Sequence, residues 1–177
     1  MQKLPFIFIF LFFCAGINAQ TSLVHKVSFT SIGPSVMSGR VVDIDVNPNQ
    51  PTEFYVAYAS GGLWYTKNNG TSFTAVTENA PTQNMGDIAV DWNSETIWIG
   101  TGESNSSRSS YAGIGILKSS DKGKTWENVG LKDSQHIGRI VINKNNPEEV
   151  IVGVIGHLYT PNAERGIFKT TDGGKTW

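Results

Sequence analysis

The stretch SSDKGKTW, from Ser119 to Trp126, occurs more than once in this sequence. A second copy, TTDGGKTW, runs from Thr170 to Trp177, and a weaker copy, TKNNGTSF, runs from Thr66 to Phe73. Successive copies begin about fifty residues apart, and self-similarity at such a period is typical of repeat architectures in which each copy belongs to one supersecondary unit. The sequence therefore predicts three copies of one folding unit.

Each copy has the composition of a tight hairpin turn. The polar residue at its third position can accept hydrogen bonds from the backbone two residues further on, and the glycine at its fifth position can adopt the left-handed conformation that the reversal requires. The aromatic residue at the end can pack the returning strand against its neighbour. We assign structural roles to the residues at these positions, which are Asp121, Gly123, Trp126, Asp172, Gly174, Trp177, Asn68, Gly70 and Phe73.

Short segments with alternating apolar residues surround these turns, as expected for strands with one buried face. The predicted strands are Asp43–Asn47, Glu53–Ala59, Gly62–Tyr65 and Phe73–Thr77 in the first unit, Asp87–Asp91, Glu95–Thr101, Gly115–Lys118 and Trp126–Val129 in the second, and Arg139–Asn143, Glu149–Ile155 and Gly166–Lys169 in the third. Four antiparallel strands per repeat form the blade of a β-propeller. The predicted fold class is therefore all-β, a β-propeller with four-stranded antiparallel blades.

The predicted propeller is incomplete. Its blades cover about 38–79, 84–130 and 136–177, and the third unit stops at Trp177, where its fourth strand should begin. Closed propellers typically have ~4 to 8 blades, so two full blades and most of a third cannot close a ring. We expect the chain to be the N-terminal portion of a longer protein.

The N-terminus has the features of an export signal. Lys3 is followed by an apolar run from Leu4 to Ala15, with a cleavage context that ends at Ala19. The run is too short for a membrane span. We expect residues 1–19 to be a cleaved signal peptide, residues 20–37 to be a lead-in segment, and the protein to be periplasmic, cell-surface or extracellular, with no membrane span after cleavage.

Composition excludes several functions. Cys14 is the only cysteine and falls in the predicted signal peptide, so disulfides, thiolate metal sites and thiol catalysis are excluded from the mature chain. The 14 Lys and Arg residues balance the 15 Asp and Glu residues, which indicates no bulk attraction to nucleic acid or to an anionic membrane. We predict no metal and no cofactor.

The connection between the second and third strands differs among the units. It is short at Ser60-Gly61-Gly62, but it runs from Glu103 to Gly113 in the second unit and from His157 to Arg165 in the third. Because strands alternate in direction, these loops should lie opposite the aspartate turns, and long loops on a rigid scaffold often bind ligands. The candidate ligand-binding residues on this face are Glu103, Arg108, Tyr111, His157, Tyr159, Arg165, Arg40 and Arg139.

These candidates also have structural interpretations. His157 can be a hydrogen-bonded loop residue instead of a ligand or base. Arg108 and Arg165 can order their own loops instead of recognising a ligand. Asp121 and Asp172 are interpreted as turn-stabilising side chains and not as calcium ligands or catalytic groups.

The turns resemble the Asp-box, or BNR, repeat of sialidase-like and sortilin-like β-propellers. Further phrases carry the same resemblance, namely Gly39-Arg40-Val41, Ala59-Ser60-Gly61-Gly62-Leu63-Trp64, Gly100-Thr101-Gly102-Glu103, Gly156-His157-Leu158 and Arg165-Gly166-Ile167-Phe168-Lys169-Thr170. Together they are similar to a family of secreted bacterial propellers labelled sortilin N-terminal-like, or "glycosyl hydrolase, BNR repeat". The resemblance covers residues 33–177 and implies the fold and export.

Two enzyme families share the Asp-box, and this sequence departs from both patterns. A sialidase places a substrate arginine in an Arg-Ile-Pro phrase, whereas the nearest strings here are Arg40-Val41-Val42 and Arg139-Ile140-Val141. A xyloglucanase places a catalytic aspartate shortly before Gly-Gly, whereas this sequence has Tyr58-Ala59-Ser60-Gly61-Gly62. Hydrolysis of a glycoside normally uses two carboxyl groups at a set separation. The weak candidates are Glu103, Glu164 and Asp87, and no catalytic residue is assigned.

Three hypotheses follow from the sequence. The first is a secreted recognition module that binds a peptide, protein or glycan through the two long loops. The second is a glycoside hydrolase whose catalytic carboxylates lie partly in blades beyond this sequence. The third is an assembly scaffold, because Asp-box propellers also include photosystem assembly factors.

Overall fold

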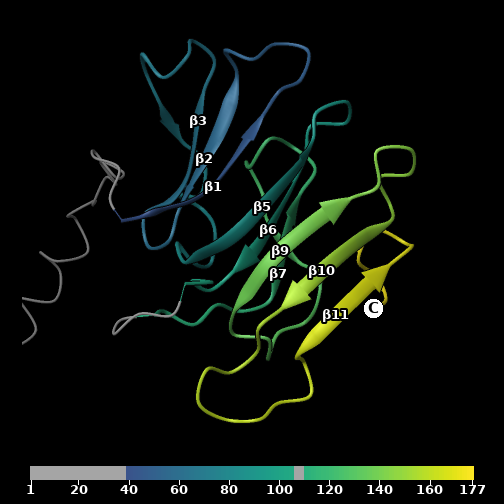
Figure 1. Cartoon of the computed structure of the whole chain (residues 1–177). Coiled ribbons are helices and arrows are strands. Elements are labelled where there is room, and N and C mark those ends of the chain that lie inside the picture. Colours follow the sequence, from purple (N-terminus) through teal and green to yellow (C-terminus); the bar gives the residue numbers. More distant parts are fainter. Residues whose placement is uncertain (1–38, 106–109) are drawn as a thin grey trace, which may run out of the picture. The chain divides into compact units, whose positions relative to one another are not determined.

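The computed structural model describes residues 39–105 and 110–177, all of which belong to one unit, Gly33–Trp177. The predicted signal peptide (1–19), the lead-in segment (20–37) and Arg108 lie outside the described residues. Within the described ranges every regular element is a β-strand (Figure 1). No helix in those ranges is long and apolar enough to span a membrane.

The strands form three antiparallel sheets in chain order. The first sheet has the order β1-β2-β3-β4, the second β5-β6-β7-β8 and the third β11-β10-β9. The prediction of two four-stranded units and three strands of another is confirmed. The strands are β1 (Val41–Val46), β2 (Phe54–Tyr58), β3 (Gly62–Thr66), β4 (Thr74–Ala75), β5 (Met85–Asp91), β6 (Thr96–Thr101), β7 (Ile116–Ser119), β8 (Glu127–Asn128), β9 (Ile137–Ile142), β10 (Val150–Val154) and β11 (Gly166–Thr170).

The predicted fourth strands are longer than the observed ones. β4 and β8 contain two residues each, and each pairs with two residues of the preceding strand. Val76 and Val129 follow these strands and donate one further backbone hydrogen bond, to Leu63 and Ile116. The Thr77 hydroxyl then accepts the Leu63 N–H, and the Gly130 carbonyl accepts the Ile116 N–H, each at 3.0 Å, before the chain departs toward the next sheet.

The three sheets share one register. Asp43 pairs with Ala57 in the first sheet, Asp87 with Gly100 in the second and Arg139 with Gly153 in the third. The three positions therefore correspond, one on each first strand. The cross-strand pairs between second and third strands also correspond, and these are Tyr55–Tyr65, Trp98–Lys118 and Ile151–Lys169.

The aspartate turns are closed by their own side chains, with one difference from the prediction. The Asp121 carboxylate accepts hydrogen bonds from the backbone N–H of Thr125 at 2.9 Å and from its hydroxyl at 2.7 Å. These contacts reach four residues ahead and not two, so one carboxylate spans the whole turn. Asp172 makes the same two bonds to Thr176. These bonds hold the pKa of Asp121 and of Asp172 down, at about 2.

The sheets meet at two seams, which contain the core. At the first seam, between the first and second sheets, the buried residues include Tyr55, Leu63, Ile88, Ile97 and Leu117. At the second seam, between the second and third sheets, they include Trp98, Ile116, Ile140, Val150 and Val152. β5 contacts both β1 and β9, so the first strands lie side by side across the seams (Figure 1).

The aspartate turn of each later sheet packs against the sheet before it. Gly123 has a φ of +84°, and a Cβ added to it would lie 2.1 Å from Val76 Cγ1. Gly174 meets Val129 in the same way across the second seam. Trp177 Nε1 donates a hydrogen bond to the Val129 carbonyl at 2.7 Å. The glycine is therefore required both for the turn conformation and for the close approach of the sheets.

Candidate functional site

The long loop of the third sheet is anchored at Asp133, in the connection between the second and third sheets. His157 Nε2 lies 2.9 Å from Asp133 Oδ1, and His157 Nδ1 lies 2.9 Å from the Thr160 hydroxyl. Because a carboxylate only accepts hydrogen bonds, Nε2 carries the proton and Nδ1 accepts from Thr160. One ring nitrogen of His157 is thus engaged within the loop, and the other is engaged by the connection between the sheets.

The other polar residues of this loop support the same anchor. Asn162 accepts the backbone N–H of His157 at 3.1 Å and donates to the Asp133 carbonyl at 2.9 Å. Glu164 accepts the Asp133 N–H at 2.8 Å, and Arg165 donates to the His157 carbonyl. Glu164 and Arg165 therefore order the loop.

One large side chain of the third-sheet loop, that of Tyr159, is exposed. Tyr159 is 87% exposed, although His157 and Thr160, which flank Leu158 and Tyr159, are joined by a hydrogen bond between their side chains. An exposed aromatic ring on an ordered loop is available for contact with a partner.

The loop of the second sheet begins at a buried carboxylate. The Glu103 side chain is 1% exposed and forms an ion pair with Arg40, whose side chain is about half exposed. The Glu103 carbonyl accepts a hydrogen bond from His136 Nδ1 at 2.9 Å. Burial, and then the neighbouring His157, lower the pKa of His136. Further along the loop, Tyr111 is 51% exposed.

A row of charged residues joins the first strands of the three sheets. Asp43 accepts the Ile88 backbone N–H at 3.4 Å, and Asp87 accepts the Ile140 N–H at 2.6 Å. Arg139, at the corresponding position of the third sheet, lies 3.4 Å from Asp87 and 4.0 Å from Asp43. Each aspartate thus bonds to the backbone of the next sheet, and the arginine offsets part of their negative charge.

Burial raises the pKa of Asp87 to about 7, with a further contribution from the negative charge of Asp43. The Ile140 N–H and the Arg139 guanidinium oppose this shift. The raised pKa of Asp87 means that this buried carboxyl group keeps its proton at a higher pH than an exposed aspartate does. A groove of about 350 Å³ runs along this row, and its lining includes Asp43, Asp45, Ile88 and Arg139. Asp87 is buried and does not line the groove.

The candidates therefore fall into three groups. Arg40 and Glu103 form one pair, Arg139 joins Asp87, and His157, Glu164 and Arg165 surround Asp133. Tyr111 and Tyr159 are exposed.

The sequence analysis did not identify Asp133 or Asn162, because neither lies in a repeated phrase and their contact joins residues far apart in the chain. Asp45, which bonds to Val90 and Trp92 across the first seam, could have been found from its place in the alternating strand that contains Asp43.

Comparison with known proteins identifies the fold. No family model matches the sequence, and no curated protein matches it. Among solved structures, an ancestral GH74 enzyme matches with a TM-score of 0.57 and 20% identity, over 76% of this chain and 18% of the enzyme. A structure of YCF48 bound to D1 peptide matches with a TM-score of 0.53 and 15% identity, over 80% of this chain and 39% of YCF48.

A third match is the GH74 xyloglucanase from Xanthomonas campestris, with a TM-score of 0.51 and 14% identity, over 77% of this chain and 23% of the enzyme. This chain thus spans less than half the length of each of these proteins. At such low identity the likeness concerns the fold and not the activity, and the resemblance to the sortilin N-terminal-like family stays a prediction. The chain has the fold of part of a β-propeller, with two four-stranded blades and three strands of another.

Proposed function

We propose that this chain is a recognition module that binds a peptide segment of another protein through its loop face, defined as the described loop residues 102–105, 110–115 and 155–165 with the connection 129–136. The observation that carries the proposal is the exposed Tyr159 on a loop held by Asp133 and Asn162. An aromatic side chain on a pre-ordered loop loses little conformational entropy when it binds, so its contact area contributes efficiently to affinity.

Two further exposed groups favour a peptide over a small anionic or metal ligand. Tyr111 offers a second exposed ring, and Arg40 is half exposed beside the second-sheet loop. Tyrosine rings can contact apolar side chains, and a guanidinium can donate to backbone carbonyls. One protein of similar fold, YCF48, has been solved with a peptide bound, which agrees with this use of the fold.

Selection from a displayed library of random peptides would test the proposal. Enriched peptides should bind the chain, and Tyr159→Ala should weaken their binding at least about tenfold, as expected for an interface hot spot. Asn145→Ala is the matched control, because Asn145 is exposed in a turn between β9 and β10, at the other end of those strands. The proposal fails if no peptide is enriched, or if Tyr159→Ala and Asn145→Ala bind equally well.

Hydrolysis of a glycoside is the second candidate function, and the observation in its favour is the raised pKa of Asp87 beside Asp43. The geometry is unfavourable, because glycosidases hold two carboxyl groups about 5 to 9.5 Å apart on either side of the substrate, whereas the Asp87 carboxyl group is buried and engaged by the Ile140 N–H and by Arg139. We expect no release of reducing sugar from plant or host glycans. Activity that Asp87→Asn abolishes would replace the recognition module with a hydrolase.

We also propose that the chain is exported through residues 1–19. Sequencing the N-terminus of the protein recovered from a secreting host should give Gln20 as the first residue. A mature protein that still begins at Met1 would contradict export by a cleaved signal.

A further inference from the structure

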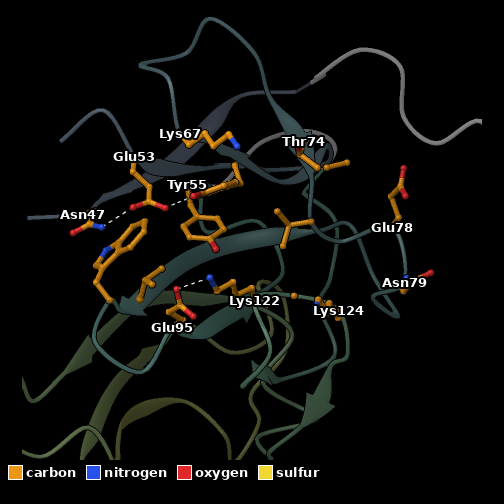
Figure 2. Close-up of a pocket in the computed structure, with 16 residues that line it drawn as sticks. Asn47, Glu53, Tyr55, Lys67, Thr74, Glu78, Asn79, Glu95, Lys122 and Lys124 are labelled. Atoms are coloured by element: carbon orange, nitrogen blue, oxygen red, sulfur yellow. Dashed lines mark hydrogen bonds and ion pairs between the residues drawn. The ribbon is translucent and has the colours of Figure 1, made fainter. Parts of the chain in front are cut away.

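A second cavity lies at the first seam, at the end of the sheets that carries the aspartate turns. Its volume is about 480 Å³, within the range of small-molecule sites. The first sheet contributes Glu53 and Tyr55 from the region of β2 and Tyr65 from β3, whereas the second sheet contributes Trp92, Glu95 and the turn residues Lys122 to Lys124 (Figure 2). The cavity is therefore formed by two blades together.

Three aromatic rings form one wall. The ring centroids of Tyr55 and Tyr65 are 4.9 Å apart, and those of Tyr55 and Trp92 are 5.3 Å apart. Trp92 Nε1 donates to Asp45 at 2.7 Å, and the Tyr65 hydroxyl donates to Glu53. These bonds fix the two outer rings, so the wall is ordered in the absence of a ligand.

The polar groups around this wall are balanced in charge. Three carboxylates (Glu53, Glu78 and Glu95) and three ammonium groups (Lys67, Lys122 and Lys124) line the cavity. Lys122 pairs with Glu95 at 2.5 Å. A balanced lining favours neither a strongly anionic nor a strongly cationic ligand, and it offers both hydrogen-bond donors and acceptors.

Tyr55 is a mostly buried residue that contributes to the lining of the cavity. Figure 2 shows Tyr55 between Glu53 on one side and the Glu95–Lys122 pair on the other. Burial and the two glutamates raise the pKa of Tyr55 to about 12, so its hydroxyl keeps its proton. Among residues 39–105 and 110–177, none forms a hydrogen bond with this hydroxyl or with the Lys67 ammonium group.

The second seam has the same architecture but a different lining. A cavity of about 470 Å³ lies there, but the residues that correspond to Tyr55 and Tyr65 are Trp98 and Lys118. The Lys118 ammonium group lies 4.7 Å from the Trp98 ring and donates to the Gly173 carbonyl at 3.0 Å. At the second seam the chain therefore places its own ammonium group over the aromatic ring, whereas at the first seam the aromatic rings of Tyr65 and Trp92 lie against Tyr55.

We propose that the cavity at the first seam binds one pyranose ring of a neutral saccharide. The apolar C–H faces of a sugar suit the aromatic wall, and its hydroxyl groups both donate and accept hydrogen bonds, as the mixed lining requires. The site is separate from the loop face, because it is built from the aspartate turns and the turns between first and second strands. The inference does not depend on the peptide-binding proposal.

Titration of the whole chain with cellotetraose and mannotetraose, followed by Trp fluorescence and calorimetry, would test the inference. At least one neutral tetrasaccharide should bind, and tetragalacturonate and the chitosan tetramer should each bind at least about tenfold more weakly. Tyr65→Lys, which copies the second seam, should weaken binding of the neutral sugar by at least about tenfold. Tyr159→Ala, on the loop face, should bind the sugar like the unchanged chain.

Two results would overturn the inference: neither neutral tetrasaccharide binds, or binding survives Tyr65→Lys unchanged. If Tyr65→Lys does not fold, Lys67→Ala and Tyr55→Phe replace it, because each removes a donor and keeps the aromatic wall. Unchanged affinity in both of these variants would then count against the site. Tighter binding of either charged tetrasaccharide would contradict the argument from charge balance.

Discussion

The Asp87 carboxylate accepts the backbone N–H of Ile140 at 2.6 Å, across the second seam. Asp43 makes the corresponding bond to Ile88 across the first seam. A carboxylate of one blade thus accepts a backbone N–H from the first strand of the next blade. That strand lies at the edge of its sheet and, among the described strands, has a neighbouring strand on one side only. This contact adds a buried polar link to the apolar packing between the blades.

The pKa of Asp87 predicts how stability depends on pH. The pKa is about 7 in the folded chain and 3.8 as the reference for an unfolded one, so between these values the folded state binds more protons. Stability should therefore fall as the pH rises from about 4 to about 7, by at most about 1.4 kcal/mol per pH unit for one proton. Urea denaturation across this range would measure it. Asp87→Asn should flatten the profile, and an unchanged slope in that variant would assign the pH dependence to another group.

Gly123→Ala should destabilise the chain by about 1 to 3 kcal/mol. The substitution places a Cβ 2.1 Å from Val76 Cγ1 at a φ of +84°, so strain in the turn adds to a clash across the first seam. Gly153→Ala is the control, because its Cβ would meet nothing closer than 3.8 Å. Thermal unfolding should show a lower Tm for Gly123→Ala and a change within about 0.5 kcal/mol for Gly153→Ala. Equal Tm values would show that the turns do not hold the seam.

Asn162→Ala should release the third-sheet loop without unfolding the sheets. Asn162 links the His157 N–H to the Asp133 carbonyl, and loss of both bonds leaves the loop free to open locally. Hydrogen exchange should become faster at residues 156–165, with a small change in Tm. Asn145→Ala is again the control. Unchanged exchange in Asn162→Ala would mean that His157 and Asp133 hold the loop without it.

The outer face of the third sheet should make the chain prone to self-association. Ile167 is 82% exposed and Ile151 is 42% exposed, whereas the corresponding Ile116 and Trp98 of the second sheet are buried against the next blade. An exposed apolar sheet face of this kind favours association. Ile167→Lys should reduce light scattering at high concentration and leave Tm unchanged. If Ile167→Lys does not change light scattering, the surface that causes self-association is not this face of the third sheet.

The sequence by itself determined the repeat, the strands and the turns, because each depends on residues that are close in the chain. Asp121 and Gly123 act within one turn, and alternation in β1, β5 and β9 follows from the two-residue period of a strand. Only the tertiary structure decided which side chains meet between blades. Glu103 became buried against Arg40, Asp133 became the anchor of the His157 loop, and Tyr55, Tyr65 and Trp92 came together at one seam. Those contacts join residues from different strands and connections, and their geometry is set by how two sheets pack, which no local pattern encodes.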